Sequence, residues 1–167
     1  MYSGGRQMAS GNVQVNPAIT NIIRILKRSR NLGEIERVYG GSQEEMITSL
    51  IQILGTDEIT LRWKAAVALH GIGKPAVACL LSCLDDVKSS VRGSVAWILG
   101  TIGDPAAVDR LIPLLADESD EVRRETAEAL GKIGDIRAQT PLSKVVTDKN
   151  KTVRVAAVEA LKAIQKN

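Results

Sequence analysis

Apolar residues recur along the chain with the spacing of a helical face, and residues 119–134 show this most clearly. Between residues 119 and 134, four apolar side chains share one face: Val122, Ala127, Leu130 and Ile133. The charged side chains of Arg124 and Glu128 fall on the opposite face, which is typical of an amphipathic helix. A shorter apolar segment follows each helix of this kind, at residues 76–84, 107–115 and 138–146. The pattern predicts a succession of helix pairs.

The helix pairs repeat at a nearly constant interval. Arginine marks one point of the pattern in four copies, at spacings of 30, 31 and 31 residues: Arg62, Arg92, Arg123 and Arg154. Glycine follows eleven residues later in three copies: Gly73, Gly103 and Gly134. Aspartate precedes the arginine by six residues in three copies: Asp86, Asp117 and Asp148. Because glycine readily ends a helix, each unit is predicted to be a first helix, a glycine turn and an antiparallel second helix.

These units set the expected organisation of the chain. One helix pair cannot bury both of its apolar faces alone, so we expect an all-α, right-handed solenoid of four to five stacked units. The predicted segments are a disordered N-terminal stretch, a degenerate helical cap, three full repeats and a truncated C-terminal repeat: 1–15, 16–56, 57–85, 86–116, 117–147 and 148–167. Ser42 and Glu45 have the spacing of a capping box, and Pro113 is expected to bend or shorten its helix.

Composition narrows the class of protein further. Hydrophobic residues make up 44% of the chain but aromatic residues only 2%, with no Phe, so the core must consist of Ala, Leu, Ile and Val. The net charge of +3 is too small to imply a nucleic-acid partner by itself. No stretch approaches the ~20 apolar residues of a membrane span, so we expect no membrane partner and a cytoplasmic protein. Cys79 and Cys83 are expected to be reduced thiols, because a zinc site needs about four ligands.

The repeated segments resemble a known family. The stretches "DESDEVRRETAEALGKIGD" and "DVKSSVRGSVAWILGTIGDPAAVDRLIPLL" resemble the HEAT-like repeat found in phycobilisome lyases and in many prokaryotic proteins. The resemblance covers residues 57–167. It implies that the second helices line a concave, partner-binding surface, and it does not specify an activity.

The positions expected to be exposed on that surface are small, weakly polar and mixed in charge. They are Thr48, Ser49, Gln52, Ala78, Cys79, Ser82, Asp109, Arg110, Pro113, Thr140 and Lys144. A nucleic-acid surface would need a stripe of Lys and Arg with interleaved aromatic residues, and this surface has none. We therefore expect a non-catalytic scaffold or adaptor that binds a protein partner through its concave face, without a cofactor.

Two tryptophans depart from the repeat. Trp63 stands where the next copies have Gly93 and Arg124, and Trp97 stands where later copies have Glu128 and Glu159. One interpretation is that Trp97 packs between first helices and fills the space beside Gly93. The other is that Trp97 is an exposed anchor for a protein partner, since tryptophan is enriched in binding hot spots.

The repeated charges favour a structural role. Asp86, Asp117 and Asp148 could each pair with the arginine of a neighbouring unit, and Arg92, Arg123 and Arg154 would complete this inter-repeat ladder. A substrate site built from carboxylates and guanidinium groups is the alternative. An active site needs its residues once, whereas these residues occur in every copy, so the ladder is the favoured interpretation.

Enzymatic sites find little support in the residues. His70 is the single histidine, which leaves no Ser-His-acid or Cys-His set. A di-iron hydroxylase built from HEAT repeats resembles this fold, but it depends on paired His-Glu motifs, and here Gly71 follows His70. The lyase branch of the family has no compact motif to test. The alternative function is therefore an accessory or lyase-like subunit, or a chaperone, for a cofactor-bearing protein such as a bilin protein.

Overall fold

Helices form every regular element that the structure describes. The computed structural model describes residues 17–28 and 32–166, except for the side chains of residues 32–34 and 36. The α-helices are α1 Pro17–Arg28, α2 Leu32–Tyr39, α3 Gln43–Leu54, α4 Ile59–Ile72, α5 Val77–Ser82, α6 Ser89–Ile102, α7 Val108–Leu111, α8 Asp120–Ile133, α9 Gln139–Val145 and α10 Lys151–Ile164. Short 3-10 helices cover Lys74–Ala76, Pro105–Ala107, Ile112–Ala116 and Ile136–Ala138. The stretch predicted for residues 1–15 lies outside the described residues.

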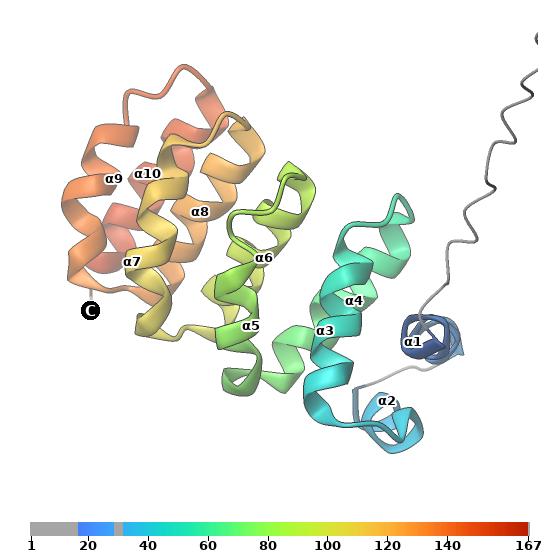
Figure 1. Cartoon of the computed structure of the whole chain (residues 1–167). Coiled ribbons are helices and arrows are strands. Elements are labelled where there is room, and N and C mark those ends of the chain that lie inside the picture. Colours follow the sequence, from blue (N-terminus) through green and yellow to red (C-terminus); the bar gives the residue numbers. More distant parts are fainter. Residues whose placement is uncertain (1–16, 29–31, 167) are drawn as a thin grey trace, which may run out of the picture.

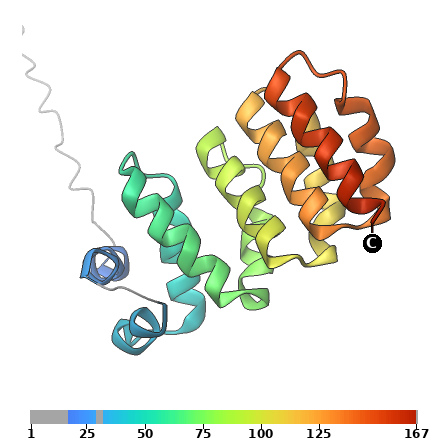
Figure 2. The ribbon, with the colours of Figure 1, turned by 180° about the vertical axis from the view of Figure 1, so that it is seen from behind.

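The helices form two layers. In Figure 2, α4, α6, α8 and α10 lie side by side in one layer. The second helices α5, α7 and α9, preceded by α3, form the other layer, which faces the viewer in Figure 1. At the N-terminal end α1 is seen almost end-on in both views, and it packs on α3 and α4. The predicted all-α solenoid is confirmed.

The Ile-Gly-Asp turns are built as the repeat requires. Gly103 and Gly134 both have a φ of 73°, in the left-handed region, and their N–H groups donate to carbonyls one turn back. The following Asp104 and Asp135 accept hydrogen bonds from backbone N–H groups two residues on, which starts the next helical turn. Glycine thus ends the first helix, and aspartate begins the second.

Two local predictions are also confirmed. Ser42 and Glu45 form both hydrogen bonds of the capping box at the start of α3. Before Pro113 the regular α-helix α7 stops at Leu111, and the chain continues as a 3-10 helix. Because proline cannot donate a backbone hydrogen bond and its ring crowds the preceding turn, the second helix of this unit is short.

The first helices do not approach one another equally. A Cβ atom added to Gly100 in α6 would lie 2.6 Å from the Cβ of Ala129 in α8, and one added to Gly131 would lie 2.7 Å from the Cα of Ala160 in α10. Such glycine–alanine contacts let two helix backbones come close. One repeat earlier, between α4 and α6, the corresponding positions are His70 and Ile98. These larger side chains accompany a wider separation, since α6 packs more closely against α8 than against α4.

Candidate interaction groove

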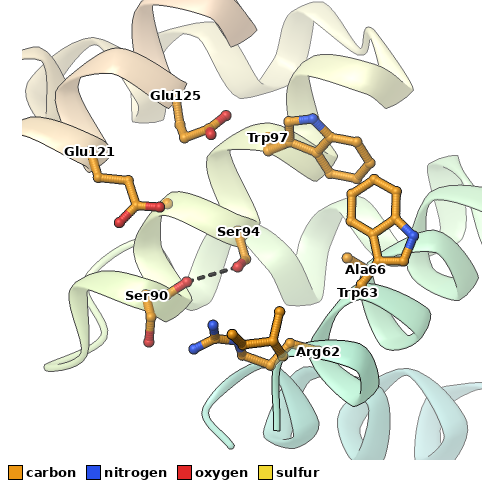
Figure 3. A pocket seen from close by; sticks show the side chains of 10 residues that line it. Arg62, Trp63, Ala66, Ser90, Ser94, Trp97, Glu121 and Glu125 are labelled. Carbon is orange, nitrogen blue, oxygen red and sulfur yellow. Dashed lines mark hydrogen bonds between the residues drawn. The ribbon is translucent and has the colours of Figure 1, made fainter. Parts of the chain in front are cut away.

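A groove opens on the layer formed by α4, α6, α8 and α10, at the wide junction between α4 and α6 (Figure 3). It has a volume of about 340 Å³. Its lining, here called the indole groove, comes from three helices: Ile59, Arg62, Trp63 and Ala66 of α4, Ser90, Gly93, Ser94 and Trp97 of α6, and Glu121 and Glu125 of α8. Because its residues come from three successive units, stacking of the repeats is what assembles it.

Small residues on α6 make the groove hollow. Ser90, Gly93 and Ser94 stand where α8 has Glu121, Arg124 and Glu125, which have long side chains. The hydroxyl of Ser94 donates to the backbone carbonyl of Ser90 at 2.8 Å, so it is turned back onto its own helix (Figure 3). The substitution of short for long side chains leaves space between α4 and α8.

The two tryptophans meet across this junction. The ring centroids of Trp63 and Trp97 lie 5.3 Å apart with an angle of 48° between the planes (Figure 3). This is within the range of favourable aromatic pairs. Trp97 is half-buried and packs against the core, as one interpretation of its position requires, yet it also lines the groove. Trp63, which the sequence marked only as a departure, is 59% exposed.

An apolar stripe runs along α4 beside the aromatic pair. Ile59, Trp63 and Val67 are spaced four residues apart, so they lie on one side of the helix. They are 72%, 59% and 43% exposed. We call these three residues the α4 stripe. Large apolar side chains that share one exposed helix face are a common sign of an interaction surface.

The α8 side of the groove is acidic. The Oε1 atom of Glu125 accepts a hydrogen bond from Arg124, while its Oε2 atom is buried and has no hydrogen-bond partner among the described residues. Burial raises the pKa of Glu125 above its usual value, and the repulsion from Glu128 adds to the effect of burial. Glu121 is exposed. The groove therefore has an exposed carboxylate, that of Glu121, and a buried Glu125 oxygen that lacks a hydrogen-bond donor.

The arginine–aspartate pairs join successive units away from the groove. Arg92 donates to both carboxylate oxygens of Asp117 at 2.8 Å, and Arg123 does the same to Asp148 at 2.8 and 3.0 Å. The third nitrogen of each guanidinium donates to two backbone carbonyls of its own unit, those of Asp86 and Val87 for Arg92. Two rungs of the expected ladder are present, and each arginine reaches forward to the next aspartate.

The ladder is absent at the α4–α6 junction. No hydrogen bond or ion pair links the Asp86 side chain to an arginine of a neighbouring unit within the described residues, so the pairing predicted for Asp86 is wrong. The Asp86 carboxylate instead accepts from the backbone N–H of Lys88 at 2.8 Å. The separation of α4 from α6 accounts for the loss, and Arg62 lines the groove instead. At the other end Arg154 donates to the carbonyls of Asp148 and Lys149.

The second-helix surface differs in part from the expected one. The positions that are exposed are Thr48, Gln52, Ala78, Ser82, Asp109, Arg110, Pro113, Thr140 and Lys144. Cys79 is half-buried, and Ser49 is only 3% exposed, so its expected exposure is wrong. The reason is that α3 packs against α1 as well as α4, which widens its buried face to include Ser49 with Met46 and Ile53.

Charged side chains on that surface already have partners. Arg110 pairs with Asp85 at 2.8 Å, and Arg137 pairs with Asp109 at 2.7 Å. These exposed pairs link neighbouring second helices. Consequently the charged side chains expected to bind a partner on this surface largely pair with one another within the solenoid.

Within residues 17–28 and 32–166, no three His, Cys, Asp or Glu side chains are grouped so that they could hold a metal ion. In the same ranges no single helix is both long and apolar enough to cross a membrane. Two consecutive helical segments, Ile59–Ile72 and Lys74–Ser82, are together long and apolar enough, but the chain bends by 111° between them.

Known proteins share this architecture. A family model for HEAT repeats matches residues 47–129 and 108–167. Among solved structures, the complex of CpcE and CpcF of phycocyanin lyase from Nostoc sp. PCC7120 is similar with 28% identity and a TM-score of 0.69, over 74% of this chain and 81% of that chain. No match is found among the curated proteins.

Two further solved structures show the fold alone, because their identity is below 25%. Human deoxyhypusine hydroxylase in complex with glycerol is 24% identical with a TM-score of 0.61, over 87% of this chain and 63% of that chain. A designed armadillo repeat protein in complex with the peptide (KR)4 is 19% identical with a TM-score of 0.54, over 86% of this chain and 80% of that chain.

Proposed function

The chain belongs to the HEAT-repeat family, and we propose that it is a non-catalytic scaffold that holds a protein partner at the indole groove and the α4 stripe. The observation that carries this proposal is the exposed indole of Trp63, stacked against Trp97 beside a hollow of about 340 Å³. Exposed aromatic side chains next to a pocket are the usual anchors of a binding hot spot. The four-residue spacing of the stripe suits a partner segment that lies along α4.

The second-helix surface is the competing location for the partner. Its exposed positions, including Asp109 and Arg110, are small or already engaged in ion pairs between units. Exposed ion pairs are worth little, so a partner that exchanged these pairs for pairs of its own would gain little affinity there. We infer that this surface makes the secondary contacts and the groove makes the primary ones.

Capture from native lysate with two variants would separate the two surfaces. Trp63→Ala removes the exposed indole, and the double variant Asp109→Arg with Arg110→Asp reverses the charges of the second-helix surface. We expect Trp63→Ala to lose the partners that the unaltered chain captures, and the charge reversal to keep them. Ile136→Ala, at another exposed apolar residue outside the groove, is the matched control. The reverse result would assign the partner to the second-helix surface.

An accessory or lyase-like role for a bilin-bearing protein is the second candidate. It is supported by the 28% identity and the TM-score of 0.69 to the CpcE–CpcF complex of phycocyanin lyase. The chain would be incubated with a bilin and an apo-phycobiliprotein, and the absorbance spectrum and covalent adducts would be measured. If neither a spectral change nor an adduct appears above the level without the chain, this candidate is excluded.

A further inference from the structure

We propose that the indole groove receives a lysine or arginine side chain of the partner, with the aliphatic part on Trp63 and the cation at Glu125. The inference rests on the proposed function, because it specifies the chemistry of the segment that the scaffold holds. Three features of the groove support it: an unsatisfied acceptor, a pair of aromatic faces and an uneven distribution of charge.

The unsatisfied acceptor is Glu125 Oε2. It is buried without a hydrogen-bond partner among the described residues, and the carboxylate lies at the groove (Figure 3). A buried acceptor that has lost its water is unfavourable until a donor reaches it. Lysine ammonium and arginine guanidinium groups are donors only, and their hydrogen bonds to a carboxylate are stronger than neutral ones. The Glu125 side chain as a whole is 16% exposed, so a small rotation of its carboxylate toward the groove would let a cationic side chain satisfy the unpaired oxygen.

The aromatic faces suit the same ligand. The Lys132 Nζ already lies 5.7 Å from the ring centroid of Trp97, so this indole takes up a cation within the protein itself. No cation is placed over Trp63 in the described part of the chain, and its ring is largely exposed. The apolar stem of a lysine or arginine can cover such a ring while its charged end remains polar.

The charges around the groove favour a basic ligand over an acidic one. Glu121 and Glu125 lie on the α8 side, and Arg62 lies on the α4 side (Figure 3). Arg124 is occupied by its bonds to Glu125 and Glu128. An acidic side chain would be repelled by both carboxylates, whereas a basic one would pair with them. Arg62 could then donate a hydrogen bond to a backbone carbonyl of the same segment.

Titration with small probes tests this chemistry without the natural partner. The probes are N-acetyl-arginine amide and N-acetyl-lysine amide, with the uncharged N-acetyl-norleucine amide and the acidic N-acetyl-glutamate amide for comparison. Trp63 and Trp97 are the two tryptophans of the chain, so intrinsic fluorescence and the indole N–H signals in NMR report on the groove directly. We expect saturable changes with the basic probes and much weaker ones with the other two.

Charge-removing variants then locate the cation. Glu125→Gln should weaken binding of the basic probes about fivefold, since a neutral acceptor replaces a charged one. Glu121→Gln should weaken it less, because that carboxylate is exposed. Glu159→Gln on α10 removes the same charge at the repeat position of Trp97 and should leave binding unchanged. Far-UV circular dichroism confirms that each variant is folded.

Each outcome decides the proposal. Equal binding of norleucine amide, tighter binding of glutamate amide, or no effect of either glutamate variant would overturn it. The scaffold proposal is tested separately, because it depends on loss of captured partners in Trp63→Ala. If that loss occurs while the basic probes fail to bind, the scaffold proposal stands and the basic ligand is wrong.

Discussion

The close approach of α6 to α8 can be tested by adding a single methyl group at Gly100. An alanine Cβ at this position would meet Ala129, with its Cβ only 2.6 Å away and the backbone of α8 equally near. Gly93, in the same helix, offers a matched control. A Cβ there would meet the nearest atoms, in the side chains of Val122 and Glu125, at 3.8 and 3.9 Å, which is ordinary van der Waals contact. Both glycines are buried and helical, so only the free space differs.

The expected difference follows from two opposing effects. Glycine-to-alanine substitution inside a helix stabilises it by roughly 1 kcal/mol, and this gain applies to both variants. Overpacking of a filled interface costs about 1–3 kcal/mol, and this cost applies only to Gly100→Ala. Gly93→Ala should therefore be as stable as the unaltered chain or more stable. Gly100→Ala should be less stable than Gly93→Ala by about 2 kcal/mol, which separates the Tm values by roughly 4–8 °C for a chain of this size.

Thermal and urea unfolding followed by circular dichroism at the helical minimum would measure the difference. The reasoning requires a fixed order, with Gly93→Ala above Gly100→Ala. If both variants have the same Tm, the two helix backbones are not held at the distance described. If Gly100→Ala is the more stable, helix propensity outweighs packing at this junction and the account of close approach is wrong.

Two further predictions concern the ladder. Arg123→Ala should reduce the free energy of unfolding by about 3 kcal/mol, the lower end of the range for a buried pair, because it leaves the largely buried carboxylate of Asp148 without its partner. Arg62→Ala, at the same repeat position without a rung, should cost less than about 1 kcal/mol in urea unfolding. The hydrogen bond from Arg123 holds the pKa of Asp148 below its usual value of 3.8. Burial raises the pKa of Asp117, but hydrogen bonds from Arg92 and the Ser119 N–H, together with the charges of Arg92 and Arg123, lower it below 3.8. Both carboxylates therefore stabilise the fold fully above pH 3.8. Their contribution is lost as the pH falls through the lower folded pKa values, so Tm should drop below about pH 4 and a Tm that is constant from pH 7 to 2 would contradict this.

The regular part of the fold could be predicted from the sequence because it is repeated. Gly103 and Gly134 recur with one period, and both adopt the left-handed conformation that the helix ends need. The pairing of Arg92 and Arg123 with the next aspartate also follows from a fixed spacing. The glycine turns and the arginine–aspartate pairs recur in successive repeats, so the spacing of these residues along the chain is enough to predict them.

The candidate site could be predicted only in part, because it depends on contacts between unlike neighbours. The prediction that Ser49 is exposed was wrong, because its burial depends on α1, which has no counterpart in the other repeats. The pairing of Asp86 was wrong because the α4–α6 spacing, which separates Asp86 from Arg62, is set at His70, eight residues after that arginine. Trp63 and Trp97 could be recognised as departures, but their contact required knowledge of how far apart the helices lie.

Departures from the repeat gather at one junction, and this bears on function. Stacking needs the same residues in every unit, so a site that occurs once must be made by residues that differ from the pattern. Here His70 and Ile98 stand where the next junctions have glycine and alanine. Small residues on α6 stand where α8 has long side chains, and Trp63 and Trp97 line the resulting groove. Each change alone would weaken the stack. Together they open and line a single groove, so the same substitutions that interrupt the solenoid supply the surface to which we assign its partner.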